Sequence, residues 1–367
     1  MLPFLRSDLT NLKAYKPHPP VPEPYDQLDT NESPIDLPAG IKATLAKHYQ
    51  DAITANRYPD GGHTELKQAI ASYVAESANN ATSDNISIGN GSDELIRSLL
   101  IAVALNNGAI LVASPTFSMY GILARTLGIP VIDVGRQGDF CINLSKAQAA
   151  ISEQDIRVVF MVHPNSPTAN PLSATEIAWL RQLPQDVLVV IDEAYFEFSQ
   201  HSLVSDSLSR SNWVVLRTFS KAFRLAAHRV GYAVAHPGLI EALEKVRLPY
   251  NLPTFSQAAA LTSMNHRNTL LTAVQATLTE RQKMTDWLHT QPALQTWPSA
   301  ANFIYCRVSE KGLAQFDMTQ TDSLQHIFNG LMHKGTLVRY TGGGLRISLG
   351  TPEENQRTRN NLETILG

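Results

Sequence analysis

The fold of this chain is decided by the stretch Val187-Leu-Val-Val-Ile-Asp192-Glu-Ala-Tyr195, which leads to Leu216-Arg-Thr-Phe-Ser-Lys221 and then to Arg229-Val-Gly-Tyr232. Its first residues form an uninterrupted apolar run, which predicts a strand that is buried on both faces of a sheet. Polar residues that follow such a strand lie at its carboxyl end, where open α/β sheets bind their ligands. The stretch therefore predicts a buried sheet, and it predicts a ligand-binding site at the carboxyl end of this strand.

Short runs rich in Val and Ile recur on both sides of this stretch, and helical patterns lie between them. The clearest helical patterns cover residues 63–77 and 92–105. Buried strands bounded by helices predict an α/β domain with a mostly parallel, seven-stranded sheet that helices cover. The expected strands cover residues 86–88, 109–113, 131–134, 158–162, 187–191, 213–216 and 231–234.

The pattern changes at two places along the chain. The first residues are rich in proline and lack periodicity, which predicts an extended arm across the surface. After Leu252-Pro253 we expect a long polar-rich helix to about residue 288, and then strands at 302–308 and 345–348. We therefore expect an N-terminal extended arm over residues 1–35 and a large cofactor-binding domain over residues 36–252. A small α+β domain over residues 253–367 is expected to pack with the N-terminal segment.

Length and composition limit the classes of protein to consider. The 367 residues exceed one compact core of ordinary size, and 43% of them are apolar. A net charge of −3 disfavours nucleic acid or an acidic membrane surface, so a small-molecule partner is expected. Neither a signal peptide nor an apolar run of about 18 residues is present, so we expect a cytoplasmic protein without membrane spans. Two distant cysteines and isolated histidines indicate neither a disulfide framework nor a metal site.

Three side chains of the deciding stretch suit pyridoxal phosphate. Asp192 would project into the crevice at the end of its strand, unless it merely caps the next helix. An amine must lose its proton to form an imine with an aldehyde, and Lys221 near a phosphate, an arginine and a carboxylate fits that role. Arg229 suits a cofactor phosphate through its fixed charge and its fork of donors, although a surface ion pair is the alternative.

Three further elements suit anions or a flat ring. Residues 88–94, Ile-Gly-Asn-Gly-Ser-Asp-Glu, predict a strand-to-helix turn whose amides could bind a phosphate, or simply a serine-capped helix. Phe117 and Tyr120 follow an expected strand and could cover a ring or belong to the core. Arg339 and Arg346 could bind a substrate phosphate or carboxylate, with a surface ion-pair network as the alternative.

Seven motifs occur in one order along nearly the whole chain. In this order they resemble the fold-type I pyridoxal-phosphate aminotransferases, and among them the branch that acts on histidinol phosphate. The motifs are Leu28-Asp-Thr-Asn-Glu-Ser-Pro34, Asn56-Arg-Tyr-Pro-Asp-Gly-Gly62, Gly89-Asn-Gly-Ser-Asp-Glu94, Pro115-Thr-Phe-Ser-Met-Tyr120, Asp192-Glu-Ala-Tyr195, Ser220-Lys-Ala-Phe223 and Leu345-Arg-Ile-Ser-Leu-Gly-Thr351.

The resemblance implies a role in cofactor binding for several residues. Lys221 would bond the cofactor aldehyde and later shuttle a proton, while Asp192 would keep the pyridine nitrogen protonated. Tyr195 would donate to the ring hydroxyl oxygen, and Tyr120 would stack on the ring. The phosphate would be held by Ser92, Asp93, Thr218, Ser220, Arg229 and, from the other subunit of a homodimer, Tyr58.

The resemblance also implies how substrate is bound, and the chain departs from the family pattern in places. Arg339 and Arg346 would take the substrate phosphate, and the arm would contribute Tyr15 and Asn31. The family's Asn-Pro-Thr-Gly reads Ser-Pro-Thr-Ala at residues 166–169, so the asparagine beside the ring oxygen is assigned to the preceding residue, Asn165. Arg224 stands where many relatives carry glycine.

The activity implied by the resemblance is transamination in histidine biosynthesis. L-Histidinol phosphate and 2-oxoglutarate would give imidazole-acetol phosphate and glutamate, in a homodimer with shared active sites. The alternatives are a lyase resembling threonine-phosphate decarboxylase and an aminotransferase of aromatic amino acids. A non-enzymatic cofactor-sensing regulator is disfavoured, because mere binding would not need Lys221, Asp192 and Arg229 together.

Overall fold

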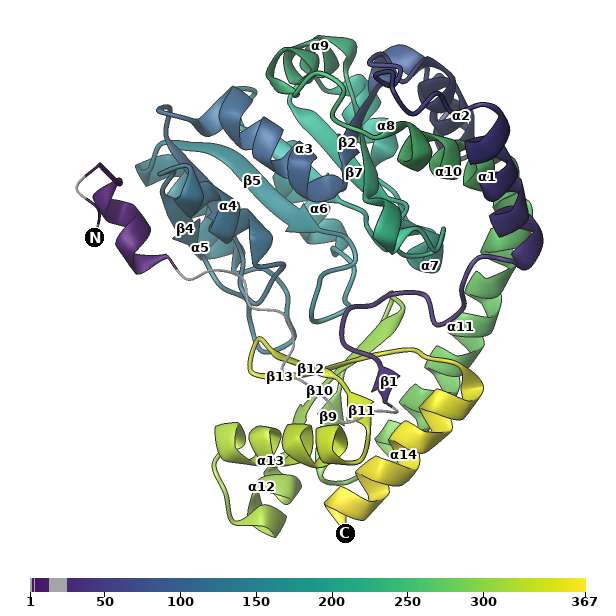
Figure 1. The fold of residues 1–367 in the computed structure, drawn as a ribbon. Helices are drawn as coiled ribbons and strands as arrows, with labels where there is room; N and C mark the ends of the chain where they lie inside the picture. Colours follow the sequence, from purple (N-terminus) through teal and green to yellow (C-terminus); the bar gives the residue numbers. More distant parts are fainter. Residues whose placement is uncertain (1, 3, 13–24) are drawn as a thin grey trace.

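The computed structural model describes Leu2, residues 4–12 and residues 25–367. Figure 1 shows a large lobe, in which helices enclose a twisted sheet, and a smaller lobe below it with sheets of its own. Helix α11 (Arg267–His289) runs along one side of the molecule from one lobe to the other. No helix within the described residues is both long and apolar enough to cross a membrane.

The large sheet is built from β2 (Ile86–Asn90), β3 (Ala109–Val112), β4 (Val131–Asp133), β5 (Ile156–Val162), β6 (Leu188–Asp192), β7 (Trp213–Thr218) and β8 (Val230–Ala235). These strands lie in the order β2-β8-β7-β6-β5-β3-β4. Neighbouring strands are parallel except for β8, which is antiparallel to β7 and β2. All seven overlap the expected apolar runs, so the predicted α/β class with a mostly parallel sheet is confirmed.

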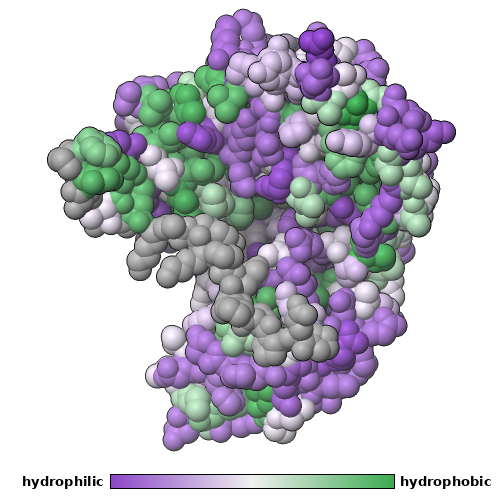
Figure 2. Space-filling model, viewed as in Figure 1, coloured by the Kyte–Doolittle hydropathy of each residue, from purple (hydrophilic) through white to green (hydrophobic). Residues whose placement is uncertain are grey.

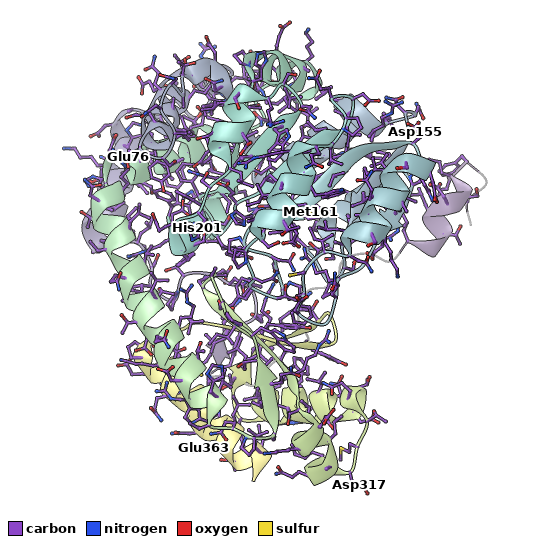
Figure 3. All side chains as sticks on the ribbon, turned by 180° about the vertical axis from the view of Figure 1, so that it is seen from behind. Glu76, Asp155, Met161, His201, Asp317 and Glu363 are labelled. Atoms are coloured by element: carbon purple, nitrogen blue, oxygen red, sulfur yellow. The ribbon has the colours of Figure 1, made fainter. Side chains whose placement is uncertain are left out.

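The helices of the large lobe are α1 (Ala39–Asp51), α2 (Thr64–Ala75), α3 (Ser92–Leu99), α4 (Met119–Thr126), α5 (Leu144–Glu153), α6 (Ala174–Arg181), α7 (Phe196–Ser199), α8 (Val204–Ser209), α9 (Pro237–Val246) and α10 (Thr254–Asn265). Alternate strand residues face opposite sides of the sheet. Phe160 and Val190 therefore join an apolar cluster with α3, α4 and α9. Met161, near the middle of the large lobe in Figure 3, joins Val189 in a second cluster with α2, α6 and α10. These two cores fix the sheet from both faces.

The helical patterns differ from expectation at two positions. The pattern over residues 92–105 forms α3 followed by a π-helical turn, η3 (Leu100–Ala104). The expected long helix between residues 253 and 288 is two helices, α10 and α11, because His266 leaves helical geometry with φ −107° and ψ 16°. Short 3-10 turns also occur at η2 (Ser83–Asn85) and η4 (Ala226–His228).

The small lobe contains β9 (Leu294–Thr296), β10 (Phe303–Val308), β12 (Arg339–Thr341) and β13 (Gly344–Ser348), with helices α12 (Glu310–Phe316), α13 (Gln320–His333) and α14 (Pro352–Leu366). Its strands form an antiparallel sheet in the order β12-β13-β10-β9. Apolar residues of α11, α13 and α14 cover this sheet and form a separate core. The face of the small lobe that is visible in Figure 2 is mainly hydrophilic.

The N-terminal segment is not uniformly extended. It contains a 3-10 helix, η1 (Ser7–Asn11), and a short strand, β1 (Asp26–Gln27), that pairs in parallel with β11 (Thr336–Leu337). The pairing forms because the Asp26 amide donates to the Gly335 carbonyl and the Leu28 amide donates to the Leu337 carbonyl. The Leu28 side chain is buried in the core of the small lobe. The residues that lead into the cavity described below are thus held against that lobe.

Candidate active site

A cavity of about 590 Å³ lies where the carboxyl ends of β5, β6 and β7 face strands β12 and β13 of the small lobe. The turn before α3, the loop after β3 and residues 29–32 complete its walls. Residues near the beginning of the chain, 29–32, and residues near its end, in β12 and β13, therefore line the same cavity. The predicted residues that line the cavity are Asn31, Ser92, Asp93, Asp192, Tyr195, Thr218, Ser220, Lys221, Arg229, Arg339 and Arg346.

Asp192 is the last residue of β6, and its carboxylate is buried. Its Oδ2 accepts a hydrogen bond from the Tyr120 hydroxyl at 2.7 Å, and its Oδ1 accepts one from the Ala194 amide at 3.1 Å. Burial raises the pKa of Asp192 to about 6, and these two hydrogen bonds oppose the rise. At neutral pH the carboxylate is therefore mostly ionised, and no cationic side chain within the described residues forms an ion pair with it.

Lys221 follows β7 and reaches the same cavity. Its Nζ donates to the carbonyl oxygen of Thr30 at 2.7 Å. Burial, together with the positive charges of Arg346 and Arg229, lowers the pKa of Lys221 to about 8. A lysine with this pKa loses its proton far more easily than an exposed one, which is what an amine needs in order to attack an aldehyde.

The amino end of α3 forms a cradle for an anion with the start of β8. A Cβ atom on Gly231 would lie 2.6 Å from the Ser92 amide nitrogen, and one on Gly91 would lie 2.6 Å from Nη2 of Arg229. At Gly231 the neighbour is backbone, so only glycine allows this close approach, while Gly91 is required by its left-handed φ of 75°. Arg229 itself has left-handed backbone geometry, with φ 52°, and its Nη2 lies 3.3 Å from Asp93 Oδ2. A helix amino end beside a guanidinium is a suitable site for a phosphate.

Two hydroxyl groups complete this cradle. The Thr218 hydroxyl donates to Ser220 Oγ at 3.0 Å and also accepts from the Ser220 amide at 3.1 Å. Nη1 of Arg229 lies 3.4 Å from Ser220 Oγ. The turn after β7 thus presents two hydroxyls and a cation to the same space, and the donor set fits the phosphate of the predicted cofactor.

Asn31 connects the two lobes beside Tyr195. Its Nδ2 donates to the Tyr195 hydroxyl oxygen at 2.9 Å, and its Oδ1 accepts from the Ser348 hydroxyl at 2.8 Å. The Asn31 backbone adopts φ 56°, and Asn302 donates to its carbonyl at 3.0 Å. Asn31 lines the cavity, as predicted for a substrate contact, but in this structure its amide group orients Tyr195.

Arg339 and Arg346 are direct partners across strands β12 and β13. Opposite residues in an antiparallel pair lie on the same face, where like charges repel. Arg346 donates to Ser166 Oγ at 3.0 Å and to the Asp29 carbonyl. Both arginines line the cavity, so an anion bound there would offset their repulsion.

Tyr120 is placed differently from its predicted role. Its side chain is fully buried behind Asp192, and its ring stacks on Phe160 with centroids 4.6 Å apart. It is Phe117 that lines the cavity, with its ring edge-on to Tyr120 at 5.4 Å. The structure thus places Tyr120 behind the wall of the cavity and not in its lining, because the helical turn of α4 directs its side chain inward.

Asn165 is also occupied elsewhere. Its Nδ2 donates to the Pro115 carbonyl at 3.0 Å and to Thr168 Oγ1 at 2.6 Å, while its Oδ1 accepts from the Thr116 hydroxyl at 3.0 Å. The whole amide group is used to tie its loop together, so it does not line the cavity. The neighbouring residue Ser166 does line the cavity, whereas the predicted cofactor contact Asn165 does not.

Tyr58, Tyr15 and Arg224 lie outside this cavity or outside the described residues. Tyr58 is 81% exposed and stacks on Tyr250 with ring centroids 4.6 Å apart. Tyr15 falls in the part of the chain that the structure does not describe. Arg224 adopts φ 61° and donates to the carbonyls of Asp36 and Leu270, so it ties the segment after Asn31 to α11.

Sequence reasoning missed the residues that act through their backbone. Asp29 and Thr30 offer carbonyl oxygens to Arg346 and Lys221, and no side-chain pattern signals such a role. Phe117 was considered with Tyr120, but their spacing of three residues left open which one faces the cavity.

Comparison with known proteins defines the class. Residues 25–362 match the family Aminotransferase class I and II, and the chain belongs to this family. The predicted family is confirmed.

Two relatives are similar over the full length. Histidinol-phosphate aminotransferase 2 of Nostoc sp. is 58% identical, and the match covers 100% of this chain and 98% of that protein. Histidinol-phosphate aminotransferase of Trichodesmium erythraeum is 55% identical over 100% of both chains. Among solved structures, histidinol-phosphate aminotransferase from Sinorhizobium meliloti in complex with pyridoxal-5'-phosphate has a TM-score of 0.81 at 23% identity, covering 93% of this chain and 90% of that one. This last likeness shows the fold.

Proposed function

We propose that this chain catalyses pyridoxal-phosphate-dependent transamination between L-histidinol phosphate and 2-oxoglutarate in histidine biosynthesis. The substrate is suggested by relatives of that name at 55% and 58% identity over the full chain. The observation that carries the proposal is the pair Arg339 and Arg346, which face each other across two strands in the cavity of Lys221 and Asp192. Paired guanidinium groups suit the phosphate of one substrate and the carboxylates of the other.

The cofactor supplies an electron sink for the carbon that bears the substrate amine. Lys221, with its pKa lowered to about 8, would move a proton from that carbon to the cofactor carbon that carried the aldehyde. Asp192, as a carboxylate, would hold the proton on the ring nitrogen. The hydroxyl of Tyr195, oriented by Asn31, would donate to the ring hydroxyl oxygen. Phe117, which lines the cavity, would cover the ring.

The phosphate of the cofactor is held by the cradle between α3 and β8. The Ser92 and Asp93 amides, the Thr218 and Ser220 hydroxyls and the Arg229 guanidinium converge there. The support for this assignment is that glycines keep the cradle open at two points where a Cβ atom would fill it.

A homodimer is part of the proposal. Tyr58 and Tyr250 form a stacked aromatic pair with exposed fractions of 81% and 47%, and the nearby Tyr49 packs edge-on against Phe255. Exposed aromatic clusters of this kind are typical of interaction surfaces. A second copy covering this surface brings Tyr58 to its neighbour's cofactor phosphate. We also propose that the enzyme is cytoplasmic. We propose further that the boundaries between its arm, its large domain and its small domain lie near residues 35 and 252.

The decisive test is half-transamination in the absence of 2-oxoglutarate. Pure protein loaded with pyridoxal phosphate is mixed with histidinol phosphate, threonine phosphate or phenylalanine, and its absorption spectrum is followed. We expect histidinol phosphate to convert the aldehyde form of the cofactor to its amine form. Lys221→Ala should lose the imine absorption band and this conversion.

Each alternative has its own outcome in that test. Release of carbon dioxide from threonine phosphate, without conversion by histidinol phosphate, would establish the lyase. Faster conversion by phenylalanine than by histidinol phosphate would establish an aromatic aminotransferase. Arg339→Ala and Arg346→Ala provide a further check, because each should raise KM for histidinol phosphate much more than KM for an unphosphorylated amine.

A further inference from the structure

Tyr120 makes three contacts that fix its position below the cavity. Its hydroxyl donates to Asp192 Oδ2 at 2.7 Å. One side of its ring stacks on Phe160 of β5, with centroids 4.6 Å apart and an interplanar angle of 13°. Phe117 packs edge-on against it at 5.4 Å and 81°. The side chain is fully buried, so neither the ring nor the hydroxyl has room to adopt another orientation.

The surroundings of Asp192 oppose its negative charge. The carboxylate is buried, and the charges of Asp93 and Glu193 act against it as well. Two donors favour the ionised form: the hydroxyl of Tyr120 and the amide of Ala194. The amide belongs to the turn itself, so Tyr120 supplies the side-chain hydrogen bond to Asp192 within the described residues. Burial raises the pKa of Tyr120, so its hydroxyl stays protonated and remains a donor.

We infer that Tyr120 is a positioning residue that keeps Asp192 ionised and aimed at the ring nitrogen of the bound cofactor. The inference rests on the proposed function, since it needs a cofactor whose ring nitrogen Asp192 contacts. Tyr120 links two walls of the site, because the same side chain fixes Asp192 through its hydroxyl and supports Phe117 through its ring. Loss of the hydroxyl alone should therefore affect the contact with the ring nitrogen and leave Phe117 in place.

The opposite face of the sheet offers a matched control. Tyr73 of α2 is also buried, and its hydroxyl donates to the buried carboxylate of Glu197 at 3.1 Å. Neither residue lines the cavity. Tyr73→Phe and Tyr120→Phe thus remove the same atom from the same kind of contact, and only the second contact leads to the cofactor.

The test uses the full chain, prepared without cofactor and then titrated with pyridoxal phosphate labelled with ¹⁵N in the ring. The dissociation constant is measured by absorption, and the ¹⁵N chemical shift reports whether the ring nitrogen carries a proton. We expect Tyr120→Phe to weaken binding by about tenfold, the scale of one hydrogen bond to a charged group, and to move the ¹⁵N signal toward the unprotonated form. Tyr73→Phe should change neither quantity.

A double substitution separates this inference from a general loss of structure. If Tyr120 acts through Asp192, Tyr120→Phe should change the dissociation constant by less than about twofold when Asp192→Asn is already present. An unchanged ¹⁵N signal in Tyr120→Phe, or an equal loss of affinity in the Asp192→Asn background, overturns the inference. Failure of the unaltered protein to bind pyridoxal phosphate would instead overturn the proposed function, so the two failures are distinguishable.

Discussion

Two adjacent carboxylates at the end of β6 have opposite surroundings. Asp192 faces the cavity and receives hydrogen bonds from a phenol and an amide. Glu193 faces the other side of the sheet, where Arg217 pairs with it at 3.0 Å and both side chains are at most 1% exposed. The Ser202 hydroxyl and the Leu203 amide also donate to Glu193. Glu193 therefore has its cation within the fold, whereas Asp192 is left with a charge that a ligand can satisfy.

This contrast distinguishes a structural acid from a functional one. Buried charges are usually paired, because an unpaired one loses its hydration without compensation. Burial raises the pKa of Glu193, and Arg217 opposes the rise. Burial also raises the pKa of Asp192, and only neutral donors oppose it. A buried carboxylate beside a cavity and without a cation is thus the better guide to a site.

The largest effect on catalysis is expected from Asp192→Asn. The amide cannot hold a positive ring nitrogen, so kcat should fall by about 10²- to 10³-fold. Steady-state kinetics at saturating cofactor measures this. The free energy of unfolding of the cofactor-free protein should not fall, because a neutral group is easier to bury. A loss of stability without a loss of kcat would assign Asp192 to the structure alone.

The largest effect on stability is expected from Arg217→Met. It leaves the Glu193 charge buried without its partner, which costs about 3–5 kcal/mol. Chemical denaturation of the cofactor-free protein measures this loss. Arg210→Met is the matched control, since the Arg210 side chain is 39% exposed and its ion pair with Asp206 lies near the surface. Equal losses in the two variants would contradict the view that Glu193 depends on Arg217.

The pH dependence of stability should identify Asp192 as well. Its pKa rises from 3.8 in its ordinary state to about 6 in the folded chain, so the folded form favours protonation. This contribution stabilises the cofactor-free protein below about pH 4 and is lost as the pH rises through 6. The loss is roughly 2–3 kcal/mol. The difference in unfolding free energy between the unaltered protein and Asp192→Asn should therefore change across this window, and a constant difference would rule the shift out.

The smallest effect is expected from Ser202→Ala. The Ser202 hydroxyl donates to Glu193 at 2.9 Å and accepts from Arg217 at 2.8 Å. Its removal leaves the ion pair intact, so stability should fall by only about 1 kcal/mol. The KM values for both substrates should stay the same, because Ser202 contacts nothing in the cavity. A changed KM would mean that the two sides of the sheet are less separate than the structure indicates.

The sheet could be predicted from sequence because its signal is local. A strand such as β6 is a continuous apolar run, and burial on both faces requires such a run at each position. The break at His266 has a weaker signal: residues 265–269 read Asn-His-Arg-Asn-Thr, of which all but the arginine have low helix propensity, but no glycine or proline marks the end of the helix.

The site was predictable where one side chain does one chemical task. Lys221, Asp192 and Arg229 carry charges that the sequence displays directly, and the structure brings them into one cavity. That Tyr120 and Asn165 do not line the cavity could not be read from the sequence, because their orientation depends on packing and on loop hydrogen bonds that no residue pattern encodes. The carbonyl of Thr30 belongs to a backbone that every residue shares, so only the structure could reveal it.

The pairing of β1 with β11 sets an order of assembly during synthesis on the ribosome. The large sheet has all its strands once residue 235 has been made, but Asp26 must wait for Thr336 before it can pair. At about 5–20 residues per second this wait lasts on the order of 5–20 seconds. Throughout that interval the small lobe, which fixes the segment containing Asp29 and Thr30, has not formed. Arg346, which donates to the Asp29 carbonyl, has not yet been synthesised. A nascent chain can thus have a complete large sheet while the small-lobe side of its catalytic cavity is still missing.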